Sequence, residues 1–273
     1  MHQHQHHHQK ELRKKMGKIE PSKGPTFYLF LGVLAIIAAT TSAYIAGVLN
    51  AGFAWPILIV AYYFVAMCVH DAIHLSAHAD SHLNRIVGWI GSLLMGMTFH
   101  AIRRSHMQHH ASVGHAHDTE AFVYRSALTL PLRLAIANFY CYTSLRAGTT
   151  GQKIQGISVA LGILGLICFH PGVALFAWII PMQTAGALFA LNTVYLPHGP
   201  LANWVDERAP ELTGFHRHHH SMPQLPWYQL FHTARKMRKQ ETKRWTCLWQ
   251  RGEQPNGRLA PAADDNPLKC VRL

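Results

Sequence analysis

Histidines are concentrated in short segments whose spacing suits metal binding. Three segments share an H-x-x-x-H or H-x-x-H-H spacing: His70 and His74; His106, His109 and His110; and His216, His219 and His220. Residues three or four apart lie on the same face of a helix, so each segment can direct its imidazoles towards a common point. An i, i+4 pair of histidines is also the spacing by which one helix binds a single metal ion.

A ninth histidine, His198, follows a long apolar run and precedes the third segment. Nine imidazoles exceed the three or four ligands that one zinc ion uses, so the sequence predicts two metal ions. Imidazole binds iron, zinc, copper and nickel alike, and the spacing does not identify the metal. Seven other histidines lack a partner in this pattern and are predicted to be surface or supporting residues: His78, His82, His100, His115, His117, His218 and His232.

The composition indicates a membrane protein. Of 273 residues, 49% are hydrophobic and only 14% are charged, whereas a soluble globular protein has roughly a quarter of its residues charged. The five cysteines are odd in number and form no C-x-x-C pair, so neither a disulfide framework nor a zinc knuckle is expected.

Four apolar runs, residues 27–49, 55–69, 154–169 and 173–196, are predicted to cross the membrane as two helical hairpins. The first has 23 uncharged residues, enough to cross a hydrocarbon core of about 30 Å. The apolar stretch 86–99 is short for a crossing and is predicted to be re-entrant or interfacial. Residues 128–145, interrupted by Pro131 and Arg133, are predicted to form an amphipathic interfacial helix. The expected fold class is therefore all-α and integral to the membrane.

The distribution of basic residues predicts the orientation of these helices. No Lys or Arg occurs within residues 24–84 or 154–200, and all 25 fall in the N-terminal tail, in residues 75–153 or in the C-terminal 73 residues. An excess of Lys and Arg marks cytoplasmic loops, so both termini and all three histidine segments are expected on the cytosolic side, where they would form a cap. The net charge of +12 then favours contact with anionic lipid headgroups. Nucleic-acid binding is not expected, because no basic face of a soluble domain is visible.

Three regions follow from these patterns. Residues 1–26 are a histidine-rich basic tail that is predicted to be disordered and is excluded from the site. Residues 27–232 form the membrane domain, and residues 233–273 form a basic cytosolic tail.

The three histidine segments, in this order around two hairpins, resemble the three histidine boxes of the membrane fatty acid desaturase superfamily. The resemblance covers residues 27 to about 232. It implies a membrane-bound di-iron enzyme with a cytosolic cap, which uses O2 and two electrons to oxidise an unactivated C–H bond of a lipid. By position, the eight histidines of the three boxes would be iron ligands, and His198 resembles an additional ligand of the family.

Some motifs are similar to those of the carotenoid ketolase branch: residues 118–120 (Asp-Thr-Glu), 195–198 (Tyr-Leu-Pro-His) and 220–223 (His-Ser-Met-Pro). The first only approximates the D-P-D of that branch. Asp118 is a candidate for orienting a ligand histidine, although an exposed loop acid is equally compatible with its position. Asn192 is a candidate for a water-mediated contact to the metals, but a helix–helix hydrogen bond is the favoured interpretation, because it lies on a different helical face from His198.

The expected activity requires electrons from a separate protein. The chain has neither a G-x-G-x-x-G motif nor a cysteine set for an iron–sulfur cluster, so a ferredoxin, rubredoxin or cytochrome b5 type donor with its reductase is implied. The basic residues Arg235, Lys236, Arg238 and Lys239 would either dock such an acidic carrier or form a solvated charged surface against lipid.

The leading hypothesis is O2-dependent desaturation or hydroxylation of a long-chain acyl lipid. Ketolation or hydroxylation of a carotenoid such as β-carotene is the first alternative, and a non-enzymatic membrane metal transporter or sensor is the second. A transporter would need polar ligands near the middle of the membrane. The histidine segments instead lie at the ends of apolar runs.

Overall fold

A computed structural model describes residues 24–124, 126–202, 204–205, 216, 219–220 and 222–230. The chain divides into two compact units, Met1–Leu230 and Phe231–Leu273, and every described residue belongs to the first. Nearly all of the predicted N-terminal tail, the whole predicted C-terminal tail and its basic residues 235–239 lie outside the described residues. The described part is helical and contains no strand.

Four helices are long and apolar enough to cross a membrane, as the sequence predicts. They are α2 (Pro25–Ile45), α3 (Ala51–Ile73), α8 (Thr150–Phe169) and a last helix, Val173–His198. Helix α3 begins four residues earlier than the apolar run, because the Asn50 side chain accepts a hydrogen bond from the backbone N–H of Phe53 and so caps the helix. Helix α2 likewise begins at Pro25, two residues before the predicted run.

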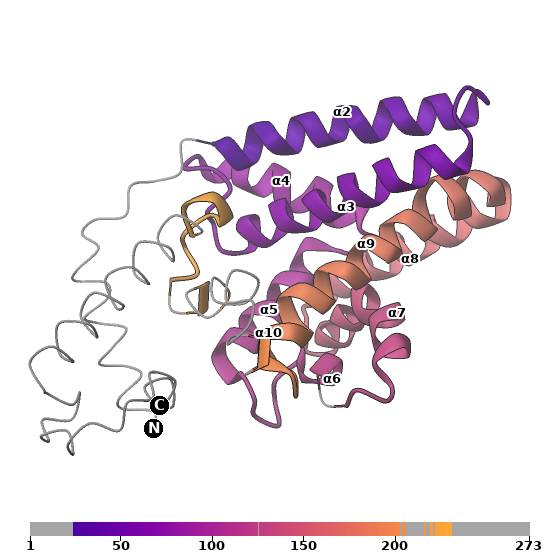
Figure 1. The fold of residues 1–273 in the computed structure, drawn as a ribbon. Helices are drawn as coiled ribbons and strands as arrows, with labels where there is room; N and C mark the ends of the chain where they lie inside the picture. The colour runs from indigo at the N-terminus through magenta and orange to yellow at the C-terminus, as the bar shows by residue number, and fades with distance from the viewer. Residues whose placement is uncertain are drawn as a thin grey trace, which may run out of the picture. The chain divides into compact units, whose positions relative to one another are not determined.

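Helix α3 is packed between α2 and the last helix (Figure 1). Phe30 of α2, Val65 of α3 and Met182 of the last helix are all essentially inaccessible and belong to one core cluster. Because lipid tails are as apolar as these side chains, close van der Waals packing rather than exclusion of water holds such helices together. The end of α3 that carries His70 and His74 is therefore set in a rigid framework.

The predicted short stretch 86–99 divides between two helices, α4 (Ser81–Leu94) and α5 (Phe99–Ser112), which meet at a bend of 100°. Gly96 adopts a φ of 68° in the bend, which disfavours any side chain there. The Phe99 ring lies directly against Gly88, where an added Cβ would be only 2.5 Å from a ring carbon. The bend thus turns the chain abruptly before α5, which bears the second histidine segment.

The predicted interfacial helix at 128–145 consists of α7 (Leu130–Tyr140) and a 3-10 segment, η1 (Cys141–Ala147). It is preceded by the short α6 (Ala121–Tyr124). Asn138 of α7 is buried, and its side-chain amide donates to Gln183 Oε1 at 3.3 Å. Gln183 Nε2 donates in turn to the Ala135 carbonyl at 2.6 Å. These polar contacts fasten α7 to the last helix.

The last helix is not a uniform α-helix. It consists of a π-helical segment η2 (Val173–Ile179), then α9 (Ile180–Ala190), a second π-helical segment η3 (Leu191–Tyr195) and α10 (Leu196–His198). π-helical turns shift the helical phase and are frequent at functional sites. The second of them ends three residues before His198, in the same helix.

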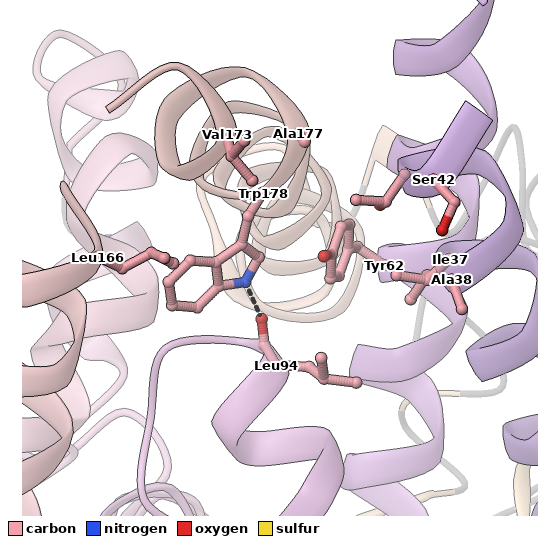
Figure 2. Close-up of a pocket in the computed structure, with 10 residues that line it drawn as sticks. Ile37, Ala38, Ser42, Tyr62, Leu94, Leu166, Val173, Ala177 and Trp178 are labelled. Carbon is pink, nitrogen blue, oxygen red and sulfur yellow. Dashed lines mark hydrogen bonds between the residues drawn. The ribbon is translucent and has the colours of Figure 1, made fainter. Parts of the chain in front are cut away.

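An apolar groove of about 410 Å³ lies between α2, α3, α8 and η2 (Figure 2). The Trp178 indole N–H donates to the Leu94 carbonyl at 2.7 Å, and the Tyr62 side chain lines the groove. Tyr62 precedes His70 by eight residues, which is about 12 Å along a helix. The groove is therefore distinct from the histidine-bearing end of α3.

Candidate metal centre

Eight of the nine predicted histidines form two groups. The ligand nitrogens within each group all lie within 4.8 Å of one another. Cluster A is His70, His74, His106 and His219. Cluster B is His109, His198, His216 and His220.

The ring nitrogens of cluster A converge. His106 Nε2 lies 3.0 Å from His74 Nε2 and 3.0 Å from Nε2 of His110, the ninth histidine. His110 Nε2 is also 3.2 Å from His219 Nε2. The nitrogen of His110 therefore lies beside cluster A, whereas its ring centroid is 4.3 Å from that of His220 in cluster B. His110 thus lies between the two clusters.

Cluster B is equally tight. His198 Nε2 lies 2.9 Å from His216 Nε2 and 3.1 Å from His220 Nε2. The latter two nitrogens are 2.9 Å apart. The ring of His109 packs against those of His198 and His220, with centroids 5.1 and 5.0 Å away. The structure thus brings His198 into contact with the third histidine segment.

Two buried nitrogens test whether a metal fits these clusters. His70 Nε2 in cluster A and His109 Nε2 in cluster B are buried and have no hydrogen-bond partner. A buried polar atom normally has a partner, because leaving it unpaired costs about 1–3 kcal/mol. Nitrogens that bind one ion at about 2.1 Å lie about 3.0 Å apart when they are at right angles and about 3.4 Å apart in a tetrahedron. The observed separations of 2.9–3.2 Å are closest to the first of these distances, so both clusters fit a metal ion held by imidazoles.

Asp118 fixes the histidine that the second segment gives to cluster B. His109 Nδ1 donates to Asp118 Oδ1 at 2.9 Å, and both side chains are fully buried. The backbone N–H groups of Gly114 and Glu120 also donate to this carboxylate. Burial alone would raise the pKa of Asp118, but the hydrogen bonds from His109 and Tyr124 hold it well below its usual value. An ionised Asp118 therefore orients His109 so that its Nε2 remains free to bind a metal.

Glu120 accepts a hydrogen bond from a cluster A histidine, as Asp118 does from a cluster B histidine. His106 Nδ1 donates to Glu120 Oε1 at 2.8 Å, and Glu120 Oε2 lies 3.8 Å from His109 Nε2. Burial lowers the pKa of His109, but the nearby carboxylates of Glu120 and Asp118 outweigh it and raise the pKa overall, making the imidazole a more basic ligand. Glu120 was not predicted from the sequence to be a site residue. The available signal was a second acid two residues after Asp118, close behind the histidine segment.

The protonation of the remaining imidazoles also suits metal binding. Burial, with the neighbouring imidazoles of His70 and His109, lowers the pKa of His110 to about 3. Burial likewise holds the pKa values of His106, His216 and His219 well below the usual value. These rings are neutral near pH 7, so their lone pairs are available to a metal without prior loss of a proton.

The other predicted residues lie away from the clusters. Asn192 Nδ2 donates to Tyr63 Oη at 2.9 Å, which is a helix–helix hydrogen bond of the favoured kind. Among the described residues, the histidines that the sequence left without a role belong to neither cluster: His78, His82, His100, His115 and His117. His218 and His232 lie outside the described residues.

Comparisons with known proteins identify the family of the chain. The family model described as "Fatty acid desaturase" matches residues 47–251, a range that includes all three histidine segments and His198. Among curated proteins, the chain is similar to an acyl-lipid omega-3 desaturase (cytochrome b5) of the endoplasmic reticulum from Arabidopsis thaliana, with 25% identity over 235 residues. The match covers 76% of this chain and 58% of that relative. No solved structure matches the chain.

Proposed function

The chain belongs to the fatty acid desaturase family, and from that premise we propose that it is a membrane-bound di-iron oxidoreductase that oxidises an unactivated C–H bond of a long-chain acyl lipid. The observation that supports this most strongly is the division of eight buried or half-buried histidines into two groups of four, with His110 between them. A single metal ion would use only three or four of them.

The ligands of the proposed centre are the eight histidines of clusters A and B, with His110 as the ninth. Iron bound there would supply the O2-dependent oxidising chemistry that C–H cleavage requires. The chain itself would contribute by orienting the ligand histidines. Asp118 and Glu120 each accept the Nδ1–H of one ligand histidine, so the opposite nitrogen keeps a lone pair directed into a cluster.

The surroundings of the clusters suit an apolar substrate. His70 lies at the end of α3 and His198 at the end of the last helix, and both helices are apolar enough to span a membrane. We therefore expect a lipid chain to reach the clusters from the bilayer, along the ends of these two helices. We place the histidine segments and both termini on the cytosolic side, because the basic residues are confined to the segments that this orientation assigns to the cytosol.

A separate carrier would deliver the two electrons. The name of the Arabidopsis relative includes cytochrome b5, and a donor of that type is the first choice over a ferredoxin or rubredoxin. Any of these three electron donors would be reduced by its own reductase. A carotenoid remains the second candidate substrate, since Asp118 and Glu120, the acids of the ketolase-like motif, both contact cluster histidines. Metal transport is disfavoured, because the clusters lie at helix ends and not midway along the spans.

The proposal is tested by comparing the masses of all lipids and pigments extracted from aerobic cells that express either the wild-type chain or a His109→Ala, His110→Ala variant. A cytochrome b5 with its reductase is co-expressed. We expect one acyl lipid to lose two hydrogens or gain one oxygen only with the wild type. A carotenoid that gains one oxygen and loses two hydrogens would instead favour the second candidate. Identical extracts, with donor and both substrate classes present, would contradict the proposal.

A further inference from the structure

A buried carboxylate lies within the first histidine segment but faces away from the clusters. Asp71, between His70 and His74, has an exposed fraction of 2%. Its Oδ2 accepts a hydrogen bond from Thr26 Oγ1 at 2.8 Å. The backbone N–H of Trp227 lies 3.3 and 3.4 Å from its two oxygens and donates to the carboxylate. Among the described residues, no Lys, Arg or His side chain forms an ion pair with Asp71.

This carboxylate joins parts of the chain that are far apart in sequence. Thr26 is the second residue of α2, Asp71 is on α3, and Trp227 follows His220 by seven residues. Packing at this contact is close, because Met222, Leu225 and Leu230 around Trp227 are buried. Asp71 is therefore the polar contact between the first histidine segment and the stretch that directly follows the third.

An aspartate at the buried position 71 indicates a function beyond packing. An apolar side chain would fill the same space without the cost of burying a charge, and a buried charge that loses its partners destabilises a protein strongly. An ionisable residue beside the apolar part of a membrane helix is by default a candidate for function, with its partner identified. Here the partner is the backbone of residue 227, so the carboxylate specifies where that segment lies.

We propose that Asp71 is a positioning residue that holds the third histidine segment in place, and thereby assembles both metal clusters. This inference rests on the proposed function, because it concerns the same metal ligands. The third segment gives His219 to cluster A, and His216 and His220 to cluster B. The first segment gives residues only to cluster A. A substitution in the first segment that empties cluster B does so without removing a ligand of that cluster, and the contact of Asp71 with Trp227 leads to the third segment.

The test is the iron content of purified protein, measured by elemental analysis, for wild type, Asp71→Ala and a His70→Ala, His74→Ala double variant. The wild type is expected to hold about two iron ions per chain and the double variant about one, since it loses ligands from cluster A alone. Asp71→Ala is expected to hold much less iron than the double variant. An iron content equal to that of the wild type or of the double variant would overturn the proposal. A wild type without iron would instead contradict the proposed function.

Two further comparisons separate positioning from a general failure to fold. Asp71→Asn keeps an acceptor for the Trp227 N–H and is expected to restore at least half of the wild-type iron. Trp227→Phe keeps the backbone N–H and Trp227→Pro removes it. Iron is therefore expected to persist in the first and fall in the second, with both giving a wild-type size-exclusion profile. Equal iron in the two Trp227 variants would overturn the proposal, even if Asp71→Ala aggregates.

Discussion

The second and third histidine segments have the same H-x-x-H-H spacing but distribute their side chains in opposite ways. In the second segment, the i and i+4 residues His106 and His110 place their nitrogens at cluster A, and His109 belongs to cluster B. In the third segment, the i and i+4 residues belong to cluster B and the i+3 residue belongs to cluster A: His216 and His220 in the former, His219 in the latter.

Helical geometry explains the difference within each segment. At about 100° per residue, positions i and i+4 differ by about 40° in direction, whereas position i+3 lies about 60° to the other side of i. An i, i+4 pair thus serves one ion, and the i+3 histidine reaches a second. The first segment lacks an i+3 histidine, and both of its residues join cluster A. The extra histidine is therefore what makes a segment contribute to both clusters.

The largest expected effect comes from removing one ligand. We predict that His106→Ala and His219→Ala each lower turnover by more than about 100-fold, beyond the range for residues that only orient a ligand. His82→Ala, at the exposed start of α4, is expected to stay within about twofold, since surface substitutions change little. Lipid product per amount of inserted protein, determined by mass spectrometry, checks this. Full activity of either ligand variant would refute its assignment.

A smaller effect is expected from the two acids, and it should differ between the clusters. Asp118→Asn is predicted to weaken iron binding at cluster B, and Glu120→Gln at cluster A, by about 10–100-fold each. Competition with a chelator measures the affinity. Asp80→Asn is the control, because the Asp80 side chain accepts hydrogen bonds from the backbone N–H groups of His82 and Leu83 at the start of α4, away from both clusters.

The assignment of each acid to its cluster is checked by adding His216→Ala, which disables cluster B. In that background, Asp118→Asn is expected to change nothing further, whereas Glu120→Gln weakens the remaining ion. If Asp118→Asn and Glu120→Gln change the iron affinity equally in this background, the assignment of each acid to one cluster is wrong.

The smallest effect is expected outside the clusters. Tyr63→Phe removes the hydroxyl that accepts from Asn192, and hydrogen bonds between membrane helices contribute about 0.6 kcal/mol on average. We predict a small drop in thermal stability in detergent and no change in iron content. A loss of iron would show that Asn192 supports the metal centre and does more than join two helices.

The sequence was sufficient to predict the spans and the ligand candidates, because each depends on local pattern. The four apolar runs all lie in helices that are long enough to cross a membrane. His198 was predicted as a ligand candidate from its place after the last run, and it belongs to one of the two histidine clusters. The start of α3 was missed, because Asn50 and Gly52 suggest a break when in fact Asn50 caps the helix.

The division of ligands between two clusters was not predictable in the same way. Spacing gives the angle between His106 and His109, but only the packing of α5 against α3 and the third segment decides which cluster each one joins. Glu120 was missed for a related reason. Its contact with His106 depends on the turn after α5, which brings an acid 14 residues away to within 2.8 Å of the ring.

The most direct measurement is the iron content of two double variants that share one substitution. His109→Ala with His216→Ala removes two ligands of cluster B, and about one iron ion per chain should remain. His109→Ala with His219→Ala removes a ligand from each cluster, and less than half of that amount should remain, with both variants inserted and monodisperse. Equal iron in the two double variants would contradict the division of the histidines into two metal clusters.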